Sequence, residues 1–187
     1  MQGLIQPTTL SLTLVATTTW ADTHFVAPGQ SIQASVDAAA DGDVIELGAG
    51  EHLGSVELMA RNLRFQGQGP EFTVWRGDNS GMVDATYSDV EFDGITFADG
   101  KGTQDGLFLR GGAMFFAGGP ADIANCAFQN NTAKGGGAIA ANNSDLNILH
   151  STFLANKLNG GLEGGEVILS IFSSVNLESC EFEQNGW

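Results

Sequence analysis

The hydrophobic and polar positions of this chain alternate in short runs, and from residue 90 onward one such phrase is repeated four times. Each phrase ends in Phe, and the four Phe residues stand 31, 25 and 29 residues apart. Small or apolar residues occupy the positions seven, five and two before each Phe. A period of this length is typical of a solenoid, in which each repeat forms one coil. The four phrases span Val90–Phe97, Ala121–Phe128, Leu146–Phe153 and Val175–Phe182.

Each phrase predicts two short strands on either side of a corner. The inward positions keep a period of two before and after a single slip, which marks the point where the chain turns. Glycine and asparagine are two of the residues found at that slip, and both tolerate the left-handed backbone that a sharp bend requires. The corner residues are Gly94, Asn125, His150 and Ser179.

The repeat also predicts two ladders that run from coil to coil. Because successive coils stack the same position about 4.8 Å apart, the Phe side chains are expected to form one core stack. An Asn three residues beyond the Phe recurs in three of the phrases and is expected to form hydrogen bonds between coils. The expected ladder residues are Phe97, Phe128, Phe153, Phe182, Asn131, Asn156 and Asn185.

The first half of the chain carries the same pattern, but its short runs are separated less regularly. Short alternating runs at 43–47, 55–58, 62–65 and 73–76 indicate strands, and Leu63 and Phe65 stand 27 residues before Val90 and Phe92. Before them, residues of about 30–40 have a helical period, with apolar positions at i, i+4 and i+7 behind Ser31 as N-cap. We expect this short helix to cover the first coil of the solenoid. The predicted fold is an all-β, right-handed parallel β-helix of about six coils, forming one domain over 22–187.

These motifs resemble those of known right-handed parallel β-helix proteins. The Gly136-Gly-Ala-Ile139 segment and the Phe-x-x-Asn motif are similar to the repeats of polymorphic outer membrane proteins. Residues 31–45 resemble the N-terminal cap and first strand of pectate-lyase-like β-helices. The resemblance implies the fold and a place on the cell surface. It implies no single activity, because this fold hosts lyases, hydrolases, adhesins and inert stalks.

Residues 1–21 have the features of a secretory signal peptide. The apolar run Leu10–Ala16 has the length of a signal h-region, and Thr19-Trp20-Ala21 resembles a cleavage site. The alternative is a retained N-terminal strand, because leucine alternates with Ser and Thr in this run. We predict a secreted protein, extracellular or on the outer cell surface. The run is too short for a transmembrane helix, so no membrane span is expected.

Charge narrows the range of partners. The formal net charge is −15, and the chain holds only seven Lys and Arg residues. Repulsion from phosphate opposes binding to nucleic acid or to an anionic membrane, so neither is expected as a partner. An acidic polysaccharide would need a bridging cation.

Three carboxylates form the one candidate site. Glu91, Asp93 and Asp122 occupy outward positions of neighbouring phrases and are expected to converge on one face, where their oxygens suit Ca²⁺. Ordinary solvated acids on a strand are the alternative. No other cofactor is expected. Cys126 and Cys180 share an inward column two coils apart, too far for a disulfide, and are expected to be buried free thiols.

The sequence therefore favours a non-catalytic β-helix that serves as a structural or adhesion module. The catalytic residues that the polygalacturonases share are missing, and no other complete catalytic set is evident. One alternative is a subunit of an extracellular filament, which self-assembles through the last coil or through an N-terminal strand. The other is a calcium-dependent protein that binds or cleaves polysaccharide through Glu91, Asp93 and Asp122.

Overall fold

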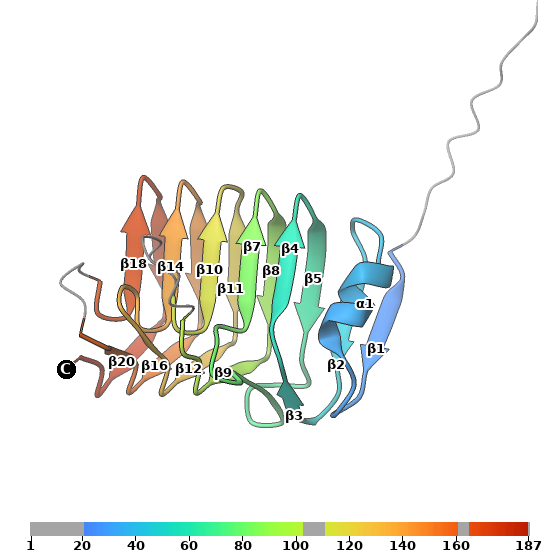
Figure 1. Cartoon of the computed structure of the whole chain (residues 1–187), viewed down its shortest axis with the longest axis horizontal. Coiled ribbons are helices and arrows are strands. Elements are labelled where there is room, and N and C mark those ends of the chain that lie inside the picture. The colour runs from blue at the N-terminus through green and yellow to red at the C-terminus, as the bar shows by residue number, and fades with distance from the viewer. Residues whose placement is uncertain (1–20, 103–110, 161–164, 187) are drawn as a thin grey trace, which may run out of the picture.

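The computed structural model describes residues 21–102, 111–160 and 165–186, and these form a parallel β-solenoid. Short strands from successive coils lie side by side and build three walls around a continuous core (Figure 1). Every strand pairing in the described residues is parallel, as the repeat predicts. The solenoid has about five turns rather than about six. The first coil falls short because helix α1 occupies the place where a strand of the five-stranded wall would lie.

The seven-stranded wall begins next to α1, and the other two walls begin one coil later. Its strands, in spatial order, are β1 (Thr23–Val26), β2 (Val44–Leu47), β5 (Asn62–Gln66), β8 (Asp89–Asp93), β11 (Ala121–Ala124), β15 (Leu146–Leu149) and β19 (Val175–Glu178). The five-stranded wall is made of β4 (Val56–Met59), β7 (Val83–Thr86), β10 (Met114–Ala117), β14 (Ile139–Asn142) and β18 (Ile168–Ile171). The six-stranded wall is made of β3 (Gly50–Leu53), β6 (Thr73–Arg76), β9 (Thr96–Ala98), β12 (Ala127–Gln129), β16 (Thr152–Leu154) and β20 (Glu181–Glu183). A small sheet pairs β13 (Thr132–Ala133) with β17 (Lys157–Leu158).

The register of the seven-stranded wall confirms the columns read from the repeat. Val90 pairs with Ala121, Ala121 with Leu146, and Leu146 with Val175. Leu63 pairs with Val90 and Phe65 with Phe92, so the repeat operates in the first half as well. A period of two sends alternate side chains into the core, which explains why these positions are apolar.

The predicted corners are present. Gly94, Asn125, His150 and Ser179 all have a positive φ, between 48° and 67°. Only a small region of left-handed backbone is open to non-glycine residues, so the four coils turn in the same way.

Gly112, which lies just before strand β10 of the five-stranded wall, allows two coils to approach closely. A Cβ placed on Gly112 would lie 1.9 Å from the carbonyl oxygen of Gly137 in the next coil. No other residue fits in so small a space. Strands β10 and β14 begin shortly after the pairs Gly111-Gly112 and Gly136-Gly137.

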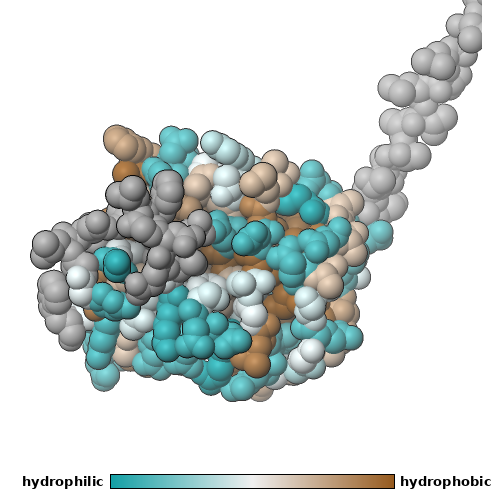
Figure 2. All heavy atoms as spheres, viewed as in Figure 1, coloured by the Kyte–Doolittle hydropathy of each residue, from teal (hydrophilic) through white to brown (hydrophobic). Residues whose placement is uncertain are grey.

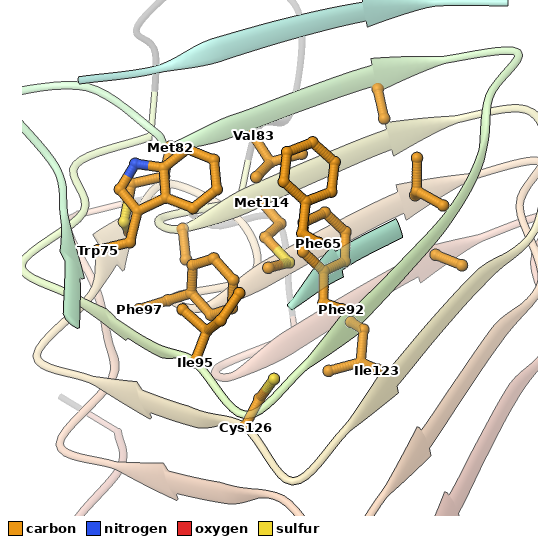
Figure 3. Packing of buried hydrophobic residues seen from close by; sticks show 14 of the residues in the cluster. Phe65, Trp75, Met82, Val83, Phe92, Ile95, Phe97, Met114, Ile123 and Cys126 are labelled. Carbon is orange, nitrogen blue, oxygen red and sulfur yellow. The ribbon is translucent and has the colours of Figure 1, made fainter. Parts of the chain in front are cut away.

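An aromatic column fills the core behind the six-stranded wall. The rings of Phe97 and Phe128 lie 5.3 Å apart, those of Phe128 and Phe153 4.8 Å, and those of Phe153 and Phe182 4.7 Å. Trp75 extends the column toward the N-terminus, with its ring 5.7 Å from that of Phe97 (Figure 3). The sequence analysis did not place Trp75 in this column.

Helix α1 (Ile32–Ala38) closes the N-terminal end of the core. Ser31 is its N-cap, since the Ser31 hydroxyl accepts a hydrogen bond from the backbone N–H of Ala34. The apolar side chains of Ile32 and Val36 are buried against the first coils. The short capping helix expected at about 30–40 is therefore present. The predicted signal peptide at 1–21 lies almost wholly outside the described residues.

Candidate functional site

The three carboxylates predicted to bind calcium lie on two neighbouring strands, and each has its own hydrogen-bond partner. Glu91 on β8 pairs in register with Asp122 on β11. The guanidinium of Arg64, one coil earlier, donates a hydrogen bond of 2.6 Å to Glu91. The Asp93 carboxylate accepts from the amide of Asn125 at 2.8 Å, and Asp122 accepts from the amide of Asn147 at 3.0 Å.

This geometry sets the three acids within an array of surface hydrogen bonds. Within the described residues, no group of three or more His, Cys, Asp or Glu side chains is arranged to hold a metal ion. Calcium binding by Glu91, Asp93 and Asp122 stays a prediction, which titration can decide.

A groove of about 840 Å³ lies over the outer face of the five-stranded wall, next to α1. Its floor follows one outward column: Glu57 on β4 pairs with Asp84 on β7, and Asp84 with Phe115 on β10. Figure 2 shows hydrophobic surface at the bottom of a hollow over β4 and β7, between hydrophilic side chains. The groove therefore combines two neighbouring carboxylates with apolar surface.

Sequence reasoning did not find this groove, because its residues come from separate coils. Only the register brings Glu57, Asp84 and Phe115 into one column, and the strand that carries Asp84 was not predicted. The alternation around Glu57 was the one available signal, since it placed this side chain outward.

The side chain of Gln33 on α1 forms one side of the groove and completes the edge of β4. Its amide oxygen accepts from the backbone N–H of Glu57 at 2.8 Å, and its amide nitrogen donates to the Glu57 carbonyl at 3.4 Å. The amide nitrogen also donates to Asp37 at 2.7 Å. At Glu57, a side-chain amide thus makes the two hydrogen bonds that a neighbouring strand would make at this edge of the five-stranded wall.

The side chains of His52 and Cys126 are buried and pack within the solenoid. His52 is fully buried in register with Trp75, and its Nε2–H donates to the Gly48 carbonyl at 2.8 Å. Cys126 is buried, and burial raises the pKa of its thiol to about 12, so the reactive thiolate is disfavoured. Cys126 and Cys180 are both free thiols, as predicted, but only Cys126 is buried, because Cys180 belongs to the last described coil and is partly exposed.

Buried asparagine amides form a continuous ladder along the core. Asn131 and Asn156 are fully buried, and the amide nitrogen of Asn131 donates to the side-chain oxygen of Asn156 at 2.9 Å. Asn156 repeats this bond to Asn185 at 3.1 Å. In each rung the same side-chain oxygen also accepts the backbone N–H of the Asn one coil earlier, at 3.1 Å for Asn131 and 2.8 Å for Asn156. The amide groups of Asn131 and Asn156 are therefore satisfied by the neighbouring coils.

The last described coil exposes the side chains that every earlier coil buries. Phe153 is fully buried, whereas Phe182 in the same column is 45% exposed. Leu177 is 44% exposed, although it pairs with the fully buried Ile148. We call residues 168–185 the open coil, because no described residue covers its core side.

Comparison with known proteins gives no assignment: no family model matches the chain, and no curated protein matches it significantly. The pectate-lyase-like and polymorphic-outer-membrane-protein-like assignments have no support from a family match, and the parallel β-solenoid stands on the structure alone. Within the described residues, no helix combines the length and the apolar character that crossing a bilayer requires.

Proposed function

We propose that this protein is a non-catalytic structural or adhesion module that acts outside the cell, either secreted or on the outer cell surface. The observation that carries the proposal is the continuous use of side chains to join one coil to the next. Buried amides, stacked rings and surface polar groups all serve this purpose. A solenoid held together in this way makes a rigid rod, in which each repeat contacts its neighbours.

Side chains on the surface also join one coil to the next. The amide of Asn176 donates to Asn147 at 2.9 Å, and the amide of Asn147 donates to Asp122, so one row of hydrogen bonds crosses three coils. On the six-stranded wall, Arg76 bridges Glu51 at 3.0 Å and Asp99. These contacts support a role in which the outer face maintains the shape of the rod.

Two measurements on the full chain test the proposal. Incubation with a panel of acidic and neutral polysaccharides is expected to release no product, as followed by reducing ends and by the absorbance of unsaturated uronates. Export from an expression host is expected to yield protein in the medium or at the cell surface, as followed by accessibility to an added protease. Released sugar would overturn the non-catalytic role, and retention inside the cell would overturn the location.

A filament subunit is the second candidate, and the exposed core side of the open coil favours it. Unpaired strand edges promote the addition of further strands. Helix α1 closes the opposite end, so head-to-tail stacking of copies requires α1 to move aside. Electron microscopy of the concentrated protein decides this hypothesis, because a field that contains only single particles would remove it.

A calcium-dependent polysaccharide protein is the third hypothesis. Glu91, Asp93 and Asp122 accept hydrogen bonds from neighbouring coils, so Ca²⁺ would have to compete with these donors, and calorimetry with Ca²⁺ that gives no saturable heat would remove the hypothesis. Saturable heat that disappears in Asp93→Ala, but persists in the exposed control Asp89→Ala, would establish the calcium site instead.

A further inference from the structure

The carboxylate of Glu57, on the floor of the groove, has no partner of its own. Gln33 holds the backbone N–H and carbonyl of Glu57. The Glu57 side chain is exposed, and its carboxylate makes no hydrogen bond or ion pair with the residues that the structure describes. The glutamates on β2, β3 and β8 differ, because each accepts a hydrogen bond from a side chain of a neighbouring coil: Glu46, Glu51 and Glu91. The groove therefore presents a carboxylate that these contacts between coils do not use.

The strands of the five-stranded wall supply no cation to this carboxylate. Strands β4, β7, β10, β14 and β18 contain no Lys, Arg or His. Glu57 and Asp84 lie in register on neighbouring strands and point outward, about 4.8 Å apart. A cation that enters the groove would therefore be attracted by both carboxylates, and the hydrophobic surface beside them strengthens that attraction (Figure 2).

The spacing of this outward column matches that of an extended polypeptide. Phe115 continues the column one coil beyond Asp84. Phe115 thus lies about 7 Å along the column from the midpoint between Glu57 and Asp84, at about 4.8 Å for each coil. In an extended chain, side chains i and i+2 point the same way and stand about 6.6–6.8 Å apart. A segment that follows the column can therefore place Lys or Arg on the two carboxylates and an apolar side chain on Phe115.

A second copy of this chain is a poor source of such a segment. The chain holds only seven Lys and Arg residues, and three of them already pair with acids of their own chain: Arg61, Arg64 and Arg76. Two copies would also repel each other, because each has a formal net charge of −15. Charge complementarity therefore favours a different, basic partner.

We propose that the groove binds an extended segment of a partner protein in which Lys or Arg alternates with apolar residues along one side. The basic side chain would pair with Glu57 and Asp84, and the apolar one would pack on Phe115, near the exposed side chain of Met59. Because Gln33 already bonds to the edge of β4, side chains rather than a backbone ladder hold the segment. Binding of such a segment goes beyond the structural role, and neither cleavage of sugars nor a location inside the cell would affect it.

The test uses the full chain and two synthetic peptides of equal composition and charge, with blocked termini. The alternating peptide SKSLSKSLS carries Lys and Leu on one side of an extended chain, and the shuffled peptide SKLSSKLSS carries them on opposite sides. We expect the alternating peptide to bind at least about threefold more tightly in fluorescence anisotropy, and its binding to weaken with added salt. In NMR spectra, the peaks that shift are expected to belong to β4, β7 and β10. A diffuse attraction to an acidic protein would not distinguish the two peptides.

Two variants with matched controls assign the preference to the groove. Glu57→Gln keeps the size of an exposed side chain, and we expect it to bind the two peptides equally, whereas Glu71→Gln in an exposed turn outside the groove is expected to keep the preference. Phe115→Ser is expected to lose the preference as well, and Phe72→Ser at an exposed ring outside the groove to keep it. Equal affinity of the wild type for the two peptides, no binding of either, or a preference that survives in Glu57→Gln would each overturn the proposal.

Other occupants of the groove give different results. We expect no saturable binding of cellohexaose, a neutral oligosaccharide, and a monomer in sedimentation. Cellohexaose binding that Glu57→Gln abolishes, with no binding of the alternating peptide, would assign the groove to a sugar and overturn the protein partner. A dimer that Glu57→Lys dissociates, while Glu71→Lys preserves it, would assign the groove to a second copy and overturn the basic partner.

Discussion

At the N-terminal end of the solenoid, α1 lays Ile32 and Val36 over the core, whereas at the C-terminal end Leu177 and Phe182 are nearly half exposed. A helix satisfies its own backbone hydrogen bonds, so it can cover an apolar surface but gives no edge on which another strand can form. Gln33 completes this closure by taking both backbone groups of Glu57. In the open coil, Leu177 and Phe182 keep part of their apolar surface exposed among the described residues. The two ends of the described solenoid therefore differ: a helix covers the core at one end, and core side chains are partly exposed at the other.

The aromatic column gives the largest test of this difference. Phe128 is fully buried between Phe97 and Phe153, so Phe128→Ala removes stacking on both faces and leaves a cavity. We expect it to lower the free energy of unfolding by about 3–5 kcal/mol, as measured by urea denaturation. Phe182→Ala in the open coil is expected to cost about 1 kcal/mol, since the Phe182 side chain has one stacked neighbour and is 45% exposed. Equal losses would show that the last coil is as well packed as the middle.

The amide ladder gives a second test of the same kind. Asn156→Leu keeps a similar volume but leaves the N–H of Asn131 without its partner in the core and removes the amide hydrogen bond to the carbonyl of Phe128. We expect a loss of about 2–3 kcal/mol in urea denaturation. For Asn185→Leu, at the partly exposed end of the ladder, about 1 kcal/mol is expected because water can replace the lost bonds. A larger loss at Asn185 than at Asn156 would contradict the ladder as described.

Gln33 tests the closed end. Gln33→Ala frees the N–H and the carbonyl of Glu57 at the edge of β4. We expect a loss of about 0.5–1 kcal/mol and faster hydrogen exchange at the Glu57 amide. Gln66→Ala on β5, where the side chain is exposed, is the matched control and is expected to leave that amide unchanged. Unchanged exchange in Gln33→Ala would mean that α1 does not seal the edge.

The smallest expected effect is that of Asp43 on thermal stability, and it appears only at acidic pH. The hydrogen bond from His24, followed by those from the backbone N–H groups of Ala40 and Asp22, lowers the pKa of Asp43 from its ordinary value of 3.8 to about 2. A carboxyl with a lowered pKa in the folded state stabilises the fold above its unfolded pKa. This stability is lost as pH falls from about 4 through about 2. We expect the Tm of the wild type to fall over this window more steeply than that of Asp43→Asn, with Asp89→Asn as an exposed control. Parallel Tm profiles for all three proteins would contradict this role for Asp43.

The repeat predicted most of the second half of the fold, because identical spacing forces identical register. The alternation around each Phe specifies which side chains point inward. The break in alternation between the fifth and the second residue before each Phe places the corner. The first coils were harder to predict. His52 and Trp75 occupy the column that Phe fills later, and neither residue type marks that column. Strand β7 was missed as well, since its sequence Val-Asp-Ala-Thr holds only one large apolar residue and gives a weak periodic signal.

The candidate sites were predictable only where one repeat contained them. Glu91 and Asp122 were placed in one column because they share a phrase position, and the structure puts them in register. The sequence could not show that Arg64, Asn125 and Asn147 would donate hydrogen bonds to the three carboxylates, since these bonds join side chains from separate coils. The contact of Gln33 with Glu57 spans 24 residues and joins a helix to a strand, so no repeat encodes it.

The amide ladder also gives the molecule a direction of assembly. Each Asn backbone N–H waits for an oxygen that only the following coil supplies, as Asn131 does for Asn156. A chain that emerges from its N-terminus completes α1 and the first coils before the later ones exist. During synthesis, each new turn supplies the side-chain oxygen that the Asn of the turn before it lacks, so the bonds of the amide ladder can form in chain order.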